Sequence, residues 1–362
     1  MLLLAGCATS TTPPDETISP VPASGGSAAL NWSAPDYVPK PVAPAVKTNA
    51  PPVVHTNRPA AVVPKPAPAP VVTWTSLNRW AAEHKFNGPR QLSSTPTTTY
   101  AISSDQGVLT LGIGSREATW NGMEVLLGFA PEIIDDQVFM HGLDLQKNLE
   151  PLLLVSSLTF DTNRVVVLDP GHGGKEAGAK SVLGDRYEKE FTLDWARRIQ
   201  SLLETNGWQV FLTRSADVEM TLSNRVAFAE AHHADVFISL HFNSVEHDKS
   251  QNGLEIYCLT PTGMPSTLIR DYPDIWADHY PNNNFDAENL QLAIRLYASL
   301  LHGTGEVDRG VRRARFMGVL RGQKRPAILI EGGYLSNPAE AKKIESPEFR
   351  QKLAEAVAAA LK

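Results

Sequence analysis

Two histidines each follow a short apolar run, which is typical of a strand buried in a sheet. His172 comes at the end of VVVLDPGHGG, where Val165–Leu168 is apolar and the glycines allow a tight turn. His241 directly follows the run Val236–Leu240. Taken alone, a glycine-rich turn such as the one around His172 is more often a plain turn or a phosphate loop. Open α/β sheets place their sites at the carboxyl ends of strands, so we expect both imidazoles at one edge.

Two glutamates occupy comparable positions. Glu188 opens the amphipathic segment Glu188–Gly207, whose apolar residues recur at helical spacing. The helix dipole alone also favours a carboxylate in a first helical turn. Glu331 follows the apolar run Ala327–Ile330. Two imidazoles and one carboxylate are the ligands of a zinc site with a position open for water, which leaves the second carboxylate free to act as a base.

Five separated motifs occur in an order that is similar to one enzyme family. They are LDPGHGG, EKE before a helix, LTRSAD with a later Arg225, ISLHFNS and ILIEGGYLSNPAEA. Together they resemble the zinc-dependent N-acetylmuramoyl-L-alanine amidases, which are cell-wall hydrolases. The resemblance covers residues 164–362, a little over half of the chain.

This resemblance implies a role for each of the four residues. His172, Glu188 and His241 would be the zinc ligands, and Glu331 would be the catalytic glutamate. The bond cut would join the lactyl group of N-acetylmuramic acid to the L-alanine of the stem peptide. The last motif carries Tyr334 where family members often have phenylalanine, which is a mild aromatic exchange.

Two other functions remain open from the residues alone. A zinc peptidase that cuts within the stem peptide would use the same metal chemistry, and only its pocket shape would differ. A non-catalytic module would use the cleft only to hold muropeptides. The complete set of two histidines and two glutamates argues against such a binder, which has no need for all four groups.

Three further polar residues match the surroundings of such a site. Arg214 and Arg225 stand at family positions, and we expect them to pair with carboxylates such as Asp217 rather than to touch substrate. Asn243, two residues after a candidate ligand, would orient His241 or a substrate amide.

Two segments near the carboxyl end bear on the substrate cleft. Arg315 belongs to a basic stretch for which we expect a solvated positive face, although muropeptide carboxylates would suit it. The segment Pro261–Asp286 lies between the expected strand of Cys258 and the expected helix from Glu288, and its four prolines prevent it from being one long helix. Some members of the family carry an autoinhibitory helix in this region, which the proline spacing disfavours. We expect instead a wall of the cleft that bears Tyr272, Trp276 and Tyr280.

Composition limits the class of protein. A length of 362 residues leaves room for more than one domain, and a net charge of −6 argues against nucleic acid as the partner. No run of eighteen apolar residues exists, so no transmembrane helix is expected. The two cysteines are too few for a disulfide framework, and Cys258 is expected to be a plain buried residue.

The amino-terminal segments predict an anchor and a spacer. Within residues 1–7, Leu4-Ala5-Gly6-Cys7 resembles a bacterial lipobox, which implies lipidation of Cys7 and a membrane-tethered protein facing the cell wall. The basic region and most of the apolar region of a signal peptide are missing, so the alternative is an unmodified apolar end. Residues 8–72 hold 15 of the 27 prolines, which predicts a disordered, semi-extended linker.

Residues 73–162 read as a small α+β domain. It resembles the small domain found at the amino terminus of copper amine oxidases and as an accessory module of envelope proteins. We expect a spacer or wall-binding module without chemistry of its own, in which His84 and His141 are isolated. The dipeptide Asn121-Gly122 predicts a two-residue hairpin turn. The expected elements are helices at Trp74–His84 and Leu143–Leu152 and strands at Val108–Ile113, Glu117–Trp120, Glu124–Leu127 and Gln137–Phe139.

Residues 163–362 alternate between strands and helices. Such alternation predicts an α/β domain with a mostly parallel sheet and helices on both faces. Beyond the segments already named, the expected elements are strands at Trp208–Thr213 and Leu254–Leu259 and helices at Leu222–Ala231, Glu288–Leu301 and Pro347–Leu361.

Overall fold

The computed structural model describes residues 73–160, 164–269 and 274–362. The predictions for Cys7, for the linker at residues 8–72 and for Tyr272 lie outside these ranges. Within them, every helix is too short or too polar to cross a bilayer.

A parallel four-strand core lies at the centre of the carboxyl-terminal part. Its order is β10-β9-β11-β14, and each neighbouring pair is parallel. β12 joins the edge of β14 antiparallel, and β13 then pairs parallel with β12. The sheet of this part is therefore mostly parallel, as predicted. The strands are β9 (Val165–Pro170), β10 (Gln209–Leu212), β11 (Val236–Asn243), β12 (Leu254–Cys258), β13 (Asp308–Arg313) and β14 (Ala327–Tyr334).

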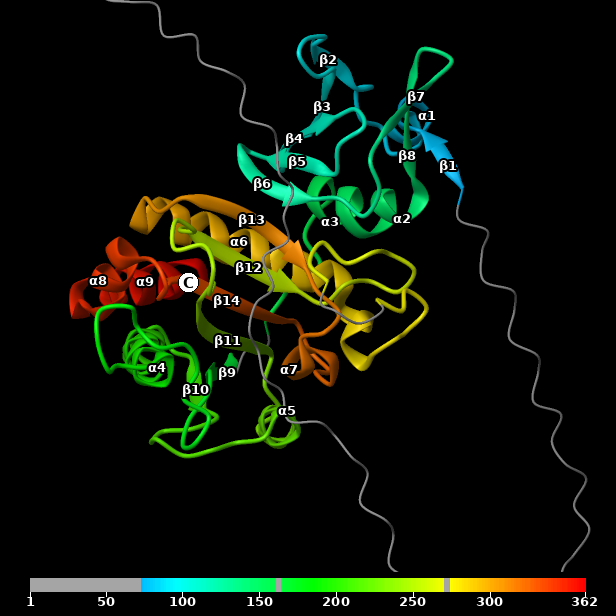
Figure 1. Cartoon of the computed structure of the whole chain (residues 1–362). Coiled ribbons are helices and arrows are strands. Elements are labelled where there is room, and N and C mark those ends of the chain that lie inside the picture. Colours follow the sequence, from blue (N-terminus) through cyan, green and yellow to red (C-terminus); the bar gives the residue numbers. More distant parts are fainter. Residues whose placement is uncertain (1–72, 161–163, 270–273) are drawn as a thin grey trace, which may run out of the picture.

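Helices cover both faces of this sheet because alternate strand residues are apolar on both sides. Val166 and Leu168 of β9 belong to the core on the side of α4, α6 and α9. Val165 and Val167 belong to the core on the side of α5 and α7. Figure 1 shows this arrangement. The helices are α4 (Glu188–Thr205), α5 (Leu222–Ala231), α6 (Asp286–Thr304), α7 (Gly318–Arg321), α8 (Pro338–Glu345) and α9 (Pro347–Ala360).

The amino-terminal part contributes an antiparallel meander. Asn121 and Gly122 have φ of 49° and 87° and connect β5 to β6, so the predicted hairpin turn is confirmed. A smaller sheet of order β1-β8-β7 lies beside the meander. The strands are β1 (Trp74–Ser76), β2 (Arg90–Ser93), β3 (Thr99–Ser104), β4 (Gly107–Gly112), β5 (Glu117–Trp120), β6 (Met123–Leu126), β7 (Glu132–Ile134) and β8 (Gln137–His141).

Two local predictions for this part need correction. Residues Trp74–Ser76 form a strand that pairs with β8, and the helix α1 begins only at Leu77 (Leu77–Glu83). The Ser76 side chain accepts a hydrogen bond from the backbone of Arg79 and caps this helix. The expected helix at Leu143–Leu152 is a run of α2 (Gly142–Asp144), a π-helical turn (Leu145–Leu149) and α3 (Glu150–Leu153).

The two parts share one sheet. β6 pairs with β13 through Val125 and Val311, so eleven of the described strands run continuously from β10 to β2. Figure 1 shows this order from β11 through β14, β12 and β13 to β6. Lys147 also pairs with Asp286 of α6 at 3.1 Å, which ties the amino-terminal part to a helix of the α/β part.

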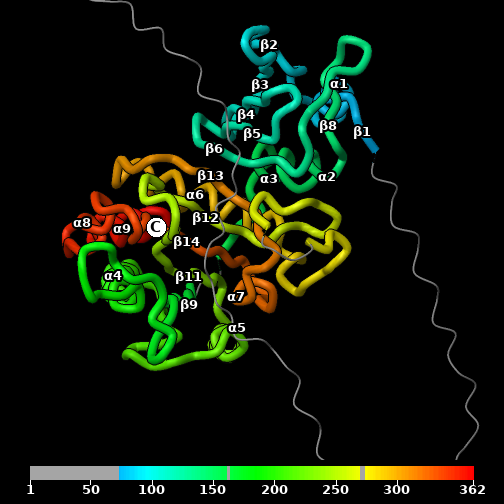
Figure 2. Tube along the Cα trace, viewed as in Figure 1, coloured from blue at the N-terminus to red at the C-terminus, as the bar shows by residue number. Residues whose placement is uncertain are grey.

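The loop between β12 and α6 lies against the amino-terminal part. Figure 2 shows this segment in yellow beside α2. Arg116 donates to the carbonyls of Pro265 and Ser266 at 3.4 Å, and Trp276 meets Phe129 edge to face at 6.1 Å. As predicted, its described residues form no long helix; they end in the 3-10 turn Pro281–Phe285. The loop is thus held from both parts of the chain.

Candidate metal centre

A buried carboxylate lies between the two histidines that the sequence singled out. His241 Nδ1 is 2.8 Å from Glu188 Oε1, and His172 Nε2 is 3.0 Å from Glu188 Oε2. One ligand atom from each of the three residues lies within 4.8 Å of the others. All three side chains are buried. The structure therefore brings together His172, Glu188 and His241 as a set that could hold a metal ion.

The electrostatics of the cluster favour an ionised carboxylate. Burial alone would raise the pKa of Glu188, but the two imidazoles outweigh it and hold that pKa well below its usual range. Burial alone would lower the pKa of His172, but Glu188 and Glu176 raise it to about 9. Burial lowers the pKa of His241 and so favours its neutral form. Positive charge is thus required at this place, whether it comes from a proton or from a cation.

Backbone geometry at the end of β9 makes this contact feasible. His172 has φ of 61°, a left-handed conformation that is uncommon outside glycine and is enriched at functional sites. A Cβ on Gly171 would lie 2.2 Å from His241 Cε1, and a Cβ on Gly178 would lie 2.6 Å from Glu188 Oε2. Glycine at both positions lets the chain approach the ligand side chains closely.

Glu188 is positioned by the start of α4 and by backbone donors. The N–H groups of Ala179 and Phe242 donate to its two carboxylate oxygens at 2.9 Å and 3.0 Å. The amino-terminal end of the helix dipole also favours the negative charge there. The carboxylate is therefore fixed before any cation arrives.

Glu331 lies on the strand next to His241. The two residues are in register between β14 and β11. The sequence suggested that the strand ends just before Glu331, but β14 continues through Tyr334. Among the described residues, Glu331 Oε2 is buried without a hydrogen-bond partner. Burial raises the pKa of Glu331 well above its usual range, and the carboxylates of Glu188 and Glu255 add to this. This carboxyl group is free to exchange a proton with a ligand.

Glu255 is a buried residue near the site that the sequence analysis missed. It is in register with Glu331 across the antiparallel pair β12 and β14. Tyr334 and Tyr257 donate their hydroxyls to it at 2.7 Å and 2.5 Å, and Arg309 donates at 2.6 Å. The signal was present, because a charged residue within the apolar strand LEIYC is unusual unless it is paired. The hydroxyl of Tyr334, the departure from the family pattern, thus has a structural partner.

Arg225 holds the backbone beneath the cluster. Its guanidinium pairs with the buried Asp169 at 2.6 Å and donates to the carbonyls of Pro170 and His172, both at 2.8 Å. Asp169 also accepts from Thr213, and Arg225 outweighs the effect of burial to hold its pKa below the usual range. The prediction of a carboxylate partner for Arg225 is therefore confirmed, with Asp169 as that partner.

Arg214 does not form the predicted ion pair. It donates to the carbonyls of Pro170, Gly171 and Lys189 at 3.0, 2.7 and 2.8 Å, whereas Asp217 pairs with Lys189. The guanidinium carries several N–H donors, so it links the carbonyls of Pro170 and Gly171 at the end of β9 to that of Lys189 in the first turn of α4.

Asn243 lies beside the cluster and its side chain contacts another residue than expected. Its amide donates to Glu255 at 3.4 Å, and its carbonyl oxygen accepts from the N–H of Ser244. It lines a cavity together with His172 and Glu188, which leaves it within reach of a ligand.

The basic stretch is not the expected solvated face. Arg315 is buried, pairs with Asp274 and donates to the carbonyls of Pro261 and Met264. Arg313 is buried as well and donates to Asn148. Both guanidiniums donate to backbone carbonyls that lie far away in the sequence, so no local pattern predicts these contacts. Cys258 is buried as predicted, and burial raises its pKa to about 11.

Cavities flank the cluster on two sides. A cavity of about 470 Å³ is lined by His172, Glu188, Asn243 and polar residues such as Lys175. A smaller one of about 70 Å³ is lined by His172, His241 and apolar residues that include Phe316. His172 lines both cavities, so the candidate ligands lie between a polar cavity and a mainly apolar one.

Comparison with known proteins agrees with the motifs and the geometry. The model of the family described as N-acetylmuramoyl-L-alanine amidase matches residues 166–362, more than half of the chain. The chain belongs to this family. The match covers all four residues of the candidate centre, whereas residues 73–162 lie outside it.

Several named relatives carry the same description. AmiC of Neisseria meningitidis serogroup B is 35% identical over 54% of this chain and 51% of its own length. AmiC of Escherichia coli O6:H1 is 29% identical over 55% and 52%. AmiA of Escherichia coli K12 is 31% identical over 54% and 74%. The solved AmiC2 of Nostoc punctiforme is 33% identical over 56% and 96%, with a TM-score of 0.46. The chain thus spans about half the length of the AmiC relatives.

Replacing Arg225 tests whether its pair with Asp169 supports the site. Arg225→Leu leaves Asp169 buried without its cation, so we expect a loss of about 3–5 kcal/mol in the free energy of unfolding. Urea denaturation at neutral pH measures this loss. The control Arg79→Leu removes an exposed arginine of α1 and should leave the unfolding midpoint unchanged. Equal midpoints for Arg225→Leu and the parent protein would contradict the role given to this pair.

Proposed function

We propose that this protein is a zinc-dependent peptidoglycan amidase. It hydrolyses the amide bond between N-acetylmuramic acid and the L-alanine of the stem peptide. The observation that carries the proposal is the buried Glu188 between two imidazoles, with an unpartnered carboxylate oxygen of Glu331 on the adjacent strand. The family of residues 166–362 and the names of its relatives support the choice of substrate.

The donor set fits zinc. His172, Glu188 and His241 would hold the ion, which matches the two imidazoles and one carboxylate of hydrolytic zinc sites. Bound zinc would polarise the amide carbonyl and lower the pKa of water at the site. The glycines at positions 171 and 178 leave room for the ligand side chains to approach one another.

Glu331 supplies the proton transfers. Its carboxylate oxygen, which has no hydrogen-bond partner among the described residues, would accept a proton from the attacking water in the ionised form, which a cation held beside it favours. The same group would then deliver that proton to the leaving amine of L-alanine. A ligand carboxylate such as Glu188 is engaged by two imidazoles and two N–H donors, so it cannot take this role. Arg225 and Arg214 keep the His172 turn in place by binding its carbonyls.

Two alternative functions make different predictions about products. A zinc peptidase would shorten the stem peptide and leave its first residue on the glycan. A wall-binding module would release nothing. The position of Glu331 beside the cluster favours catalysis over binding alone, because a binder gains nothing from a buried unpartnered carboxylate.

The remaining segments fit a protein of the bacterial cell envelope. We propose that Cys7 carries a lipid that anchors the chain to the membrane on the periplasmic side. Residues 8–72 would then act as a spacer that lets the enzyme reach the wall. Residues 73–162 would be a spacer or wall-binding module, in which the two histidines pack against aromatic rings: His84 stacks on Trp80 and His141 on Phe129.

Two substitutions separate the base from the ligands. Glu331→Gln should retain zinc but lose about 10²–10⁴-fold in turnover, since it removes the proton acceptor and no ligand. His172→Ala should lose both zinc and turnover. Metal analysis of the purified variants and hydrolysis of purified wall measure the two quantities. A fully active Glu331→Gln variant would reject the assignment.

Product analysis distinguishes the amidase from the peptidase. Digestion of purified sacculi with the full chain should release free stem peptides that begin at L-alanine, which mass spectrometry identifies. Removing zinc with a chelator should stop the release, and adding zinc back should restore it. Glycan chains that still carry shortened stems would instead identify a peptidase.

Fractionation tests the anchor. With a complete signal peptide placed before the chain, the parent protein should follow the membrane fraction, and Cys7→Ser should move to the soluble periplasm with unchanged turnover. Equal partitioning of the two forms would remove the anchor while leaving the metal centre untouched.

A further inference from the structure

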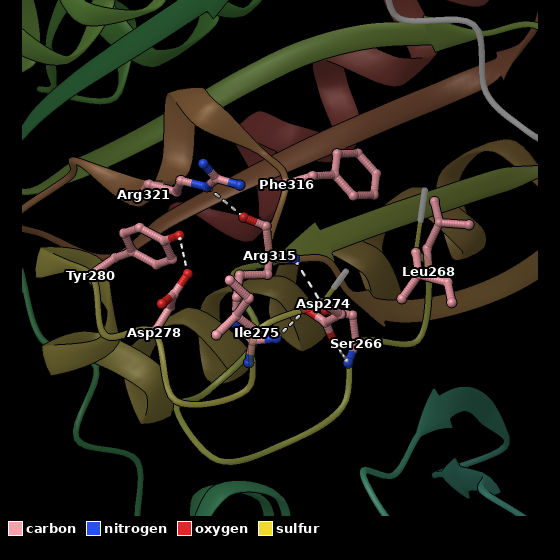
Figure 3. Close-up of a pocket in the computed structure, with 10 residues that line it drawn as sticks. Ser266, Leu268, Asp274, Ile275, Asp278, Tyr280, Arg315, Phe316 and Arg321 are labelled. Atoms are coloured by element: carbon pink, nitrogen blue, oxygen red, sulfur yellow. Dashed lines mark hydrogen bonds and ion pairs between the residues drawn. The ribbon is translucent and has the colours of Figure 1, made fainter. Parts of the chain in front are cut away.

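A third cavity lies one side chain away from the candidate metal centre. It has a volume of about 190 Å³ and shares Phe316 with the small cavity that contains His172 and His241. Figure 3 shows it between the loop that carries Asp278 and Tyr280 and the segment that carries Arg315 and Arg321. We call it the side cavity.

Part of the side cavity is a rigid frame. The buried Arg315 is neutralised by Asp274 and fixed by two backbone carbonyls, while Asp274 also accepts from the N–H of Ser266. These groups satisfy one another across the loop. The frame therefore holds the walls in place but offers a ligand little net charge.

Two other charged side chains on the walls have no ion-pair partner in the described part of the chain. Arg321 lies over the ring of Tyr280 at 4.9 Å and, among the described residues, donates from its Nε alone, to the carbonyl of Arg315 at 2.6 Å. Asp278 accepts from the hydroxyl of Tyr280 at 3.0 Å. Neither forms an ion pair with a described residue. Tyr280 lies between them, as Figure 3 shows, with Arg321 over its ring and Asp278 at its hydroxyl. The cation of Arg321 and the anion of Asp278 therefore line the same cavity.

Half-buried charges without counter-charges cost free energy, which a ligand of matching charge would recover. The matching ligand carries a carboxylate and an ammonium together, on an aliphatic stem that suits Leu268, Ile275 and Phe316. The free amino-acid end of a diamino-diacid side chain has this form. On the proposed function, an extended stem peptide places its third residue roughly 10 Å from the scissile amide. The side cavity, which shares Phe316 with the small cavity at His172 and His241, lies in that neighbourhood.

We propose that the side cavity binds the zwitterionic end of a diamino-diacid side chain in the stem peptide, with its carboxylate on Arg321 and its ammonium on Asp278. This inference rests on the proposed function and adds a determinant of specificity to it. The peptide then passes through the small cavity beside Phe316, and the polar cavity of about 470 Å³ on the other side of the cluster receives the glycan.

Matched substrates test the inference on the full chain loaded with zinc. Three disaccharide tripeptides carry diaminopimelate as third residue: the free form, one with its side-chain carboxylate amidated, and one with its ammonium acetylated. The parent protein should prefer the free form roughly tenfold in kcat/KM over each of the others. A parent protein that treats all three alike would overturn the inference.

Two variants should lose these preferences separately. Arg321→Gln should lose the preference for the free carboxylate and keep that for the free ammonium, whereas Asp278→Asn should do the reverse. The controls Arg79→Gln and Asp105→Asn, at exposed positions of the amino-terminal part, should keep both. Loss of kcat/KM on all three substrates to the same degree would indicate a structural defect and contradict the assignment.

Binding keeps this test independent of the proposed activity. Calorimetry of the free L-alanyl-γ-D-glutamyl-diaminopimelate tripeptide with the Glu331→Gln full chain should show binding that Arg321→Gln weakens roughly tenfold. If no muropeptide is cut but this binding pattern holds, the proposed function fails while the subsite stands. Cleavage without the pattern would remove the subsite alone.

Discussion

The interaction on which the site depends is the carboxylate of Glu188 buried between two imidazoles. Its two oxygens reach His172, in the turn after β9, and His241 of the neighbouring strand β11. Two backbone N–H groups hold the same carboxylate from other sides. Without positive charge, this arrangement would leave a buried anion with only neutral donors, which is costly. The fold therefore creates a demand for a cation at the end of its central strands.

The rest of the structure keeps these three groups within reach of one another. Parallel pairing of β9, β11 and β14 places His172, in the turn after β9, beside His241 of β11, and His241 beside Glu331 of β14, although the three residues are far apart in the chain. Arg225 neutralises the buried Asp169, and Arg214 donates to the carbonyl of Gly171 in the turn after β9. Glu255 of β12 lies in register with Glu331 and accepts hydrogen bonds from two tyrosine hydroxyls and from Arg309. Chemistry and support thus come from strands of one sheet together with the helices and turns that flank it.

Local signals in the sequence predicted much of this arrangement. Apolar runs and amphipathic spacing located β9, β11, β14 and α4, and Asn121-Gly122 located a hairpin because a two-residue turn is decided by its own residues. Long-range partners were not accessible in the same way. Asp169 and Arg225 are 56 residues apart, and the basic stretch gave no sign that Arg315 lies against the carbonyls of a distant loop. Within the shared sheet, the two parts of the chain join where Val125 of β6 pairs with Val311 of β13, and no local pattern marks this pair.

The central claim is that His172, Glu188 and His241 bind zinc, and X-ray absorption at the zinc edge tests it most directly. The zinc-loaded full chain should show two imidazole nitrogens at about 2.0–2.1 Å and carboxylate oxygen at about 2.0–2.2 Å. His241→Ala should remove one imidazole contribution or the metal itself. A sulfur ligand at about 2.3 Å, or a spectrum unchanged by His241→Ala, would contradict the account.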